Sequence, residues 1–162
     1  MKKILLLSVM ALLLMACSTG KNAVDPQRAQ AIKALIESRQ FMVMVGSMRP
    51  LSAPTISVSQ GQKMIVRDDM VTCYLPYVGS GQNVGYGASG HKAMNFSNAM
   101  LDYKVEYPKE DRARVTFKVD NGDDHYRFHV EVFMNGKTTI DVEPRGRDAI
   151  SYSGMLHGLD AL

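Results

Sequence analysis

The chain of 162 residues has no tryptophan, only two cysteines and little excess of either charge. Its 19 Lys and Arg residues stand against 16 Asp and Glu residues, and Lys2 and Lys3 lie in an N-terminal segment that export would remove. The remaining chain carries 17 basic and 16 acidic residues and no basic block. Nucleic-acid binding needs a clustered positive surface. We therefore expect no nucleic-acid partner.

Motifs of common enzyme classes are also missing. The sequence contains no Gly-x-Ser-x-Gly, no His-Glu-x-x-His, no Cys-x-x-Cys and no Walker loop. Gly85-x-Gly87-x-x-Gly90 matches the dinucleotide fingerprint as a string, but that motif must open a helix after a strand, and no helical pattern follows it here. We expect a protein without catalytic residues and without a cofactor.

The longest apolar run, Ile4 to Leu14, is too short to be a membrane anchor. Its 11 residues span about 16 Å as a helix, against a hydrocarbon core of roughly 30 Å. The run follows two lysines and ends in Leu14-Met15-Ala16-Cys17, which resembles a bacterial lipobox. We expect a signal peptide over residues 1–16, a polar tether over 17–24 and a single domain over 25–162. An ordinary secretory signal is the alternative.

Lipidation would decide where the protein resides. In the lipobox interpretation Cys17 carries acyl chains such as palmitate, and two or more chains anchor a protein stably. Ser18 follows the cysteine where an Asp would oppose sorting to the outer membrane, and no acidic run follows. We expect a lipoprotein on the periplasmic face of the outer membrane, with the membrane as a partner through its N-terminal lipid.

The rest of the sequence predicts one helix and many strands. Asp25-Pro26 is typical of a helix start, and an apolar stripe predicts a helix over about 26–39. Apolar and polar residues then alternate through much of residues 101–142, with Asn121-Gly122 and Asn135-Gly136 at the expected hairpin turns. This pattern predicts an α+β fold: one N-terminal helix packed on a largely antiparallel β-meander of about seven or eight strands, with curling into a half-barrel as an option.

One stretch resembles a known family. The order Asp69-x-Val71-x-x-Tyr74-Leu75-Pro76-Tyr77-x-Gly79, followed by Tyr126-x-Phe128, Asn135-Gly136 and Ile150-Ser151-Tyr152-x-Gly154, is similar to exported Bacteroidota proteins catalogued as domain of unknown function 4251. The resemblance covers about Phe41 to Gly154. It implies export, a single domain and a helix-plus-sheet fold, and it implies no activity.

A glycine-rich loop supplies the candidate binding site. Residues 79–90 hold five glycines in twelve positions, which excludes a strand or helix interior. Tyr74, Tyr77, Tyr86 and His91 flank the loop or lie in it, and aromatic rings there would line a pocket for a sugar, peptide or lipid fragment. The alternative is that Tyr74 and Tyr77 pack at a sheet edge with their hydroxyls bonded to the backbone.

Two groups of side chains are candidate metal ligands. Met42, Met44 and Met48 share one face of a predicted strand, and thioethers suit Cu(I). Met42 and Met48 would lie about 20 Å apart along that strand, so they cannot share one ion. His125 and His129 would lie about 13 Å apart on a strand, which excludes joint coordination. We expect core packing for the methionines and no metal site.

Other reactive groups have ordinary interpretations. Cys73 is the only thiol if Cys17 is acylated, and its alternation with apolar neighbours predicts a buried residue. Asp141 and Glu143 have a spacing of about 7 Å that glycosidases use, but nearby arginines predict an exposed, ion-paired edge.

The sequence therefore favours an envelope lipoprotein that acts as a non-enzymatic binding module for an unknown small molecule or envelope protein. The alternatives are a structural or accessory subunit of an envelope assembly, which would use an exposed sheet edge, and a glycan or peptide hydrolase.

Overall fold

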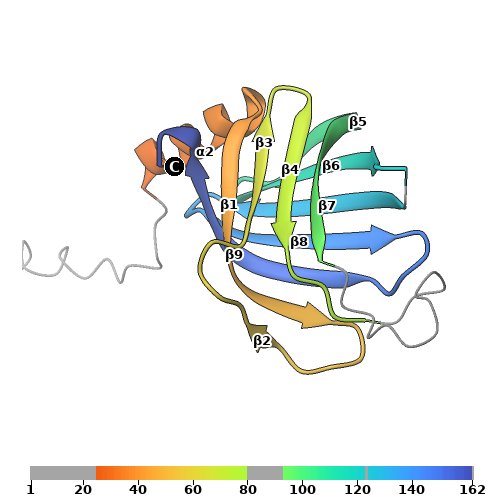
Figure 1. Cartoon of the computed structure of the whole chain (residues 1–162). Coiled ribbons are helices and arrows are strands. Elements are labelled where there is room, and N and C mark those ends of the chain that lie inside the picture. Colours follow the sequence, from red (N-terminus) through yellow and green to blue (C-terminus); the bar gives the residue numbers. More distant parts are fainter. Residues whose placement is uncertain (1–24, 80–92, 123, 162) are drawn as a thin grey trace, which may run out of the picture.

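Alternating burial organises most of the chain into strands. The computed structural model describes residues 25–79, 93–122 and 124–161 (Figure 1). Its strands are β1 (Gln40–Pro50), β2 (Ile56–Ser57), β3 (Lys63–Arg67), β4 (Met70–Leu75), β5 (Met94–Lys109), β6 (Arg112–Asp120), β7 (His125–Phe133), β8 (Lys137–Pro144) and β9 (Ile150–Gly158). All pairings are antiparallel, and consecutive strands from β3 to β9 are neighbours. The predicted meander is therefore present.

The sheet closes on itself, which corrects the predicted architecture. β1 pairs with β3 on one side and with β9 on the other, so that β1 and β3 to β9 form a closed eight-stranded antiparallel barrel. The β1–β9 ladder runs from Phe41 opposite Gly158 to Pro50 opposite Ile150, with a register shift between Val45 and Ser47. The expected α+β fold with an open or half-barrel meander is wrong. Turn signals specify neighbouring hairpins, whereas closure depends on a pairing between the two ends of the chain.

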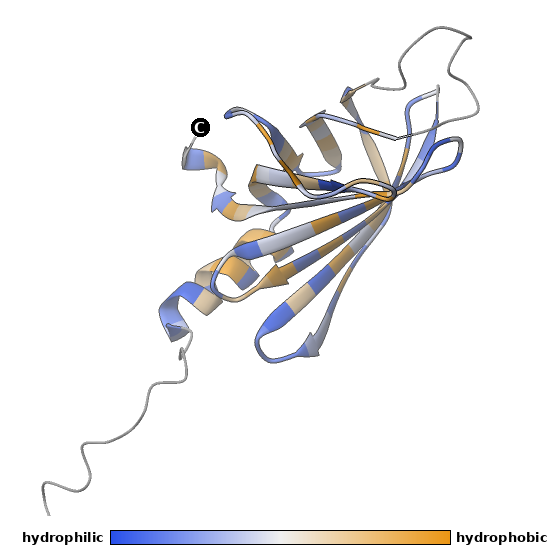
Figure 2. Ribbon diagram, turned by 90° about the horizontal axis from the view of Figure 1, so that it is seen from below, coloured by the Kyte–Doolittle hydropathy of each residue, from blue (hydrophilic) through white to orange (hydrophobic). Residues whose placement is uncertain are grey.

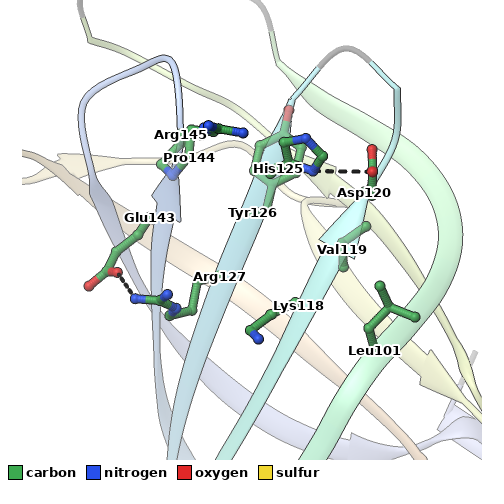
Figure 3. A pocket seen from close by; sticks show the side chains of 10 residues that line it. All are labelled: Leu101, Lys118, Val119, Asp120, His125, Tyr126, Arg127, Glu143, Pro144 and Arg145. Atoms are coloured by element: carbon green, nitrogen blue, oxygen red, sulfur yellow. Dashed lines mark hydrogen bonds and ion pairs between the residues drawn. The ribbon is translucent and has the colours of Figure 1, made fainter.

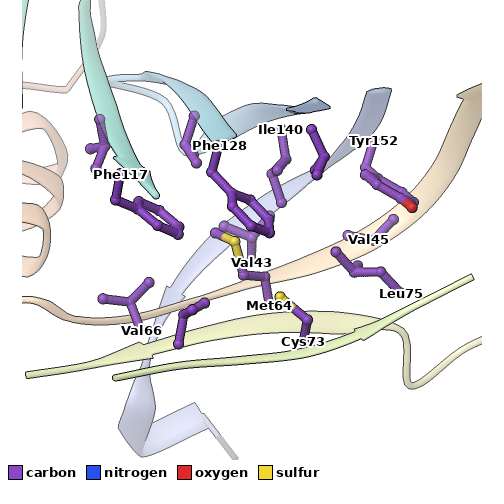
Figure 4. Close-up of a cluster of buried hydrophobic side chains, with 14 of the residues drawn as sticks. Val43, Val45, Met64, Val66, Cys73, Leu75, Phe117, Phe128, Ile140 and Tyr152 are labelled. Carbon is purple, nitrogen blue, oxygen red and sulfur yellow. The ribbon is translucent and has the colours of Figure 1, made fainter. Parts of the chain in front are cut away.

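The barrel interior is filled by side chains. Bands of orange and blue alternate along the strands in Figure 2, and the alternating apolar residues of the strands are buried. Phe117 and Phe128 stack with ring centroids 4.8 Å apart, and Phe41, Phe128 and Tyr152 are completely buried. Figure 4 shows the rings of Phe117, Phe128 and Tyr152 packed among Val43, Met64 and Ile140. Cys73 is buried here as predicted, and burial raises the pKa of its thiol, which keeps it protonated.

Helix α2 (Pro26–Glu37) begins at the predicted residue and covers one end of the barrel. The Asp25 side chain caps it by accepting from the backbone N–H of Gln27 at 3.0 Å. Ile32 and Ile36 enter the core, and the Tyr103 hydroxyl on β5 donates to the Ile36 carbonyl at 2.9 Å. The predicted helix over about 26–39 is thus two residues too long at its C-terminus.

The short 3-10 helix η2 (Leu159–Ala161) ends the described chain. Among the residues that the structure describes, no helix has the length and apolar character needed to cross a membrane.

Helix docking depends on Ile36, which yields a stability prediction. Ile36→Ala removes a fully buried side chain and should lower the free energy of unfolding by about 2–5 kcal/mol in urea denaturation. Gln30→Ala, on the exposed face of the same helix, should change it by less than about 0.5 kcal/mol. Equal effects of the two substitutions would show that the helix does not pack into the barrel.

Two tyrosines that contact the helix predict a loss of stability in alkali. Burial raises the pKa of Tyr103 to about 12, and burial together with the Glu37 carboxylate raises that of Tyr107 to about 12. The unfolded chain releases these protons near pH 10. The folded state holds more protons between those values, so stability is fully present below about pH 10 and falls as pH rises toward about 12.

Thermal melts from pH 9 to 12 should show a falling Tm, with a shallower fall for Tyr103→Phe. An unchanged Tm over this range, or the same slope in the variant, would contradict the assignment.

Candidate functional site

The predicted aromatic site is only partly within the described residues. Cys17, Tyr86, His91 and nearly all of the glycine-rich loop lie outside them. The two tyrosines that are described do not converge. Tyr74 points outward from β4 and is 47% exposed, whereas Tyr77 is 2% exposed at the barrel end.

Tyr77 has the structural role that was the alternative prediction. Its hydroxyl donates to the backbone carbonyl of Asp148 at 2.9 Å, and the Arg147 guanidinium lies 4.4 Å from the ring centroid. Burial raises its pKa, and the nearby Arg147 charge offsets part of that rise. A Cβ at Gly79 would lie 2.5 Å from the Tyr77 hydroxyl, so a glycine is needed there.

Arg147 belongs to a polar cluster, here called the barrel-end cluster, with Asp124, Tyr126 and Tyr77. Its Nε donates to Asp124 at 3.4 Å and its Nη2 donates to the Tyr126 hydroxyl at 2.6 Å. The Arg147 and Asp124 side chains are only 12% and 10% exposed. Asp124 also accepts backbone N–H groups from His125, Arg145 and Gly146 at 2.8–3.3 Å. The cluster therefore ties the β6–β7 turn to the segment between β8 and β9.

Beside this cluster, the outer wall of the barrel is hollowed. The hollow has a volume of about 520 Å³ and lies over the ends of β6, β7 and β8 (Figure 3). Its lining residues are Leu101, Lys118, Val119, Asp120, His125, Tyr126, Arg127, Glu143, Pro144 and Arg145. Tyr126 connects the two features because it lines the hollow and accepts the Arg147 hydrogen bond.

Charges in the hollow are arranged in cross-strand pairs. Arg127 donates to Glu143 at 3.5 Å, and His125 Nδ1 lies 3.2 Å from Asp120, as the dashed lines in Figure 3 show. Lys118 donates to Asp102 at 2.7 Å, and this contact lowers the pKa of the Asp102 carboxyl. These pairs are more than half exposed, so each contributes little to stability and can be exchanged for a ligand at small cost.

A serine, an aspartate and a histidine form a row beside the hollow without forming a catalytic triad. Ser151, Asp141 and His129 occupy directly paired positions on β9, β8 and β7. Ser151 donates to Asp141 at 2.5 Å, so the carboxylate stands between the hydroxyl and the imidazole. A triad needs the imidazole in the middle to take the hydroxyl proton. Glu143 is more than half exposed and forms an ion pair with Arg127, which fits the predicted ion-paired edge for this residue.

Sequence reasoning missed the barrel-end cluster. The sequence predicted an exposed, ion-paired edge for the arginines near Asp141 and Glu143, but the Arg147 side chain and its partner Asp124 are largely buried. Asp124 and Arg147 lie on different connections, and only the pairing of β7 with β8 brings them together. No local pattern signals such a contact.

Comparisons with known proteins identify the family of this chain. A family model described as a domain of unknown function, DUF4251, matches residues 23–156. The chain belongs to this family. It is also similar to the crystal structure of a DUF4251 family protein from Bacteroides eggerthii, with 15% identity and a TM-score of 0.68, covering 85% of this chain and 92% of that one. No curated protein matches. The resemblance of the sequence to this domain family is thus confirmed, whereas export stays a prediction. At 15% identity, the structural likeness shows a shared fold alone.

The barrel-end cluster predicts a large effect for a single carboxylate. Asp124→Ala removes the carboxylate that faces the largely buried Arg147 charge and an acceptor of three backbone N–H groups, of which the Arg145 N–H keeps the His125 carbonyl at 2.9 Å. It should cost about 3–5 kcal/mol in urea denaturation. Glu143→Ala, which removes an exposed partner of Arg127, should cost less than about 1 kcal/mol. A cost for Asp124→Ala within the range of the control would refute the structural role of the cluster.

Proposed function

We propose that the protein is an exported, lipid-anchored module of the outer membrane that faces the periplasm and binds a small ligand without transforming it. The observation that carries the binding role is the hollow of about 520 Å³ on the outer wall of the barrel. Ligand pockets commonly have volumes of this order. The N-terminal segment that ends in Cys17 supports export and anchoring.

The lining of the hollow favours a ligand with an acidic group. Lys118, Arg127 and Arg145 stand against two carboxylates, and the His125 imidazole adds a further donor. Leu101 is 53% exposed and offers an apolar contact next to these charges. A guanidinium binds carboxylate or phosphate oxygens with two parallel hydrogen bonds. A small amphiphilic acid fits this chemistry best.

The chemistry of the described residues supports a binding role over catalysis. Burial raises the pKa values of Tyr77, Tyr126 and Cys73, which keeps these groups neutral and unsuited to act as bases near pH 7. The row of Ser151, Asp141 and His129 has the wrong order for nucleophilic catalysis. A hydrolase is therefore the weaker proposal.

The accessory-subunit alternative has less support in this fold. It was expected to use a long exposed sheet edge, and barrel closure pairs β1 along its length with β9. Strand β2, which adds to the side of β1, has only two residues. So short an edge offers few main-chain hydrogen bonds to a partner. The longer edge is residues 101–109 of β5, which pair with β6 but not with β4, and helix α2 contacts this stretch through Tyr103 and Tyr107.

Native mass spectrometry of the full-length protein, extracted from its own membrane in mild detergent, tests this proposal. We expect a mass that fits cleavage before Cys17 plus acyl chains, with a bound small molecule that leaves at higher activation energy. The double variant Lys118→Glu/Arg145→Glu should lose that molecule. Arg49→Glu/Arg67→Glu, with the same charge change on β1 and β3, should retain it.

Each part of the proposal can fail separately. An unacylated mass would contradict anchoring, and a wild-type protein without any bound molecule would contradict the binding role. A ligand retained by the Lys118→Glu/Arg145→Glu variant would place the site elsewhere.

A further inference from the structure

Barrel closure gathers soft metal-ligand side chains on the outer wall, where β1 pairs with β9. In the β1–β9 ladder, Met42 lies directly opposite His157 and Met44 lies directly opposite Met155. Their neighbours in the chain, Phe41, Val43 and Leu156, are in the core cluster. Successive side chains on a strand point to opposite faces, so all four point outward.

The register brings three donor atoms within reach of one ion. Directly opposite residues have Cβ atoms about 4.5–5.5 Å apart, and Met42 and Met44 lie about 7 Å apart along one face. A methionine sulfur and an imidazole Nδ1 each lie only two bonds beyond Cβ. Met42 therefore has His157 as its neighbour across the ladder and Met44 as its neighbour along the same strand. The Met155 methyl group turns toward Gly136, which leaves that side chain at the rim.

The third methionine of the sequence pattern faces the other way. The register shift between Val45 and Ser47 inserts one residue at Gly46, so Met48 turns inward and is part of the core cluster. The distance along β1 therefore excludes Met48 from a shared ion, but it does not exclude Met42 and Met44. The second strand that a shared site needs is β9.

The three side chains that would bind the ion differ in how far they are exposed. Met42 is only 2% exposed although it faces outward, and it is not part of the core cluster. Met44 is 37% exposed, and His157 is half-buried. A shielded sulfur beside two more accessible donors gives an ion a route of entry and a partly dry place to bind.

We infer that Met42, Met44 and His157 form a binding site for Cu(I). Two thioethers and an imidazole are soft, neutral ligands, and thioether donors select Cu(I) over Zn(II). Lys63 on β3 is paired with Met44 and opposes any cation, so a singly charged ion is favoured over a divalent one.

Competition with a chromophoric Cu(I) chelator, carried out anaerobically on the full-length protein in detergent, measures the affinity. We expect one Cu(I) to bind and the affinity to fall at least tenfold in Met44→Leu and in His157→Asn. Met70→Leu is the matched control because Met70 is also an exposed strand methionine, and its paired residues are Arg67 and Ala99. Both cysteines stay in every variant, so copper held by a thiol is common to all.

Ag(I), an air-stable substitute for Cu(I), gives an independent readout. In methyl NMR spectra, Ag(I) should shift the methionine methyl signals of Met42 and Met44 and leave those of Met48 and Met70 in place. Unchanged affinity in Met44→Leu and His157→Asn, an equal loss in Met70→Leu, or an absence of Cu(I) binding would each overturn the inference.

Discussion

The pairing of β1 with β9 is the contact on which the rest of the molecule depends. It joins residues near 41–50 to residues near 150–158, and it converts a meander of hairpins into a closed barrel. Closure surrounds the core with strands, so that large side chains such as Phe41 and Tyr152 are completely buried. It also pairs both sides of β1, a strand that an open sheet would leave at its edge.

A filled interior moves the chemistry to the outside and the ends of the barrel. Helix α2 covers one end through Ile36 and Tyr103, and the barrel-end cluster holds the connections at the β6–β7 turn and between β8 and β9. The hollow lies on the wall beside that cluster, and Tyr126 belongs to both. The barrel-end cluster holds these connections in place, and a ligand can replace the exposed ion pairs in front of them. Both properties suit a surface that binds a ligand. The proposed copper site uses another part of the same wall, where β1 meets β9.

The local part of the fold was predictable from the sequence. Alternation of apolar and polar residues located the strands, Asn121-Gly122 and Asn135-Gly136 located two turns, and Asp25-Pro26 located the start of the helix. Closure was not predictable, because the β1–β9 register joins residues at least 100 positions apart and has no turn to mark it. The orientation of Met48 was wrong for a similar reason, since only the register shift at Gly46 reveals that the strand changes face.

For the candidate sites too, the sequence indicates the residue types, but the contacts depend on strand pairing. Tyr74 and Tyr77 lie three positions apart in the family-like motif, yet one points outward and the other is buried beside Arg147. Asp124 and Arg147 meet where β7 pairs with the next strand, β8, whereas Met42 and His157 meet because the two ends of the chain pair. Their residue types carry chemical information in the sequence, but their proximity exists only once the strands have paired.

The most direct test of this account is a measurement of the contacts of the Met42 methyl group by nuclear Overhauser spectroscopy in the metal-free protein. The account predicts cross-peaks from this methyl to the His157 ring, together with cross-peaks between Val43 and Leu156 on the inner face of the same ladder. Cross-peaks from Met42 to the core rings of Phe117 or Phe128 would place it inside the barrel. That result would contradict the closed register and every conclusion drawn from it.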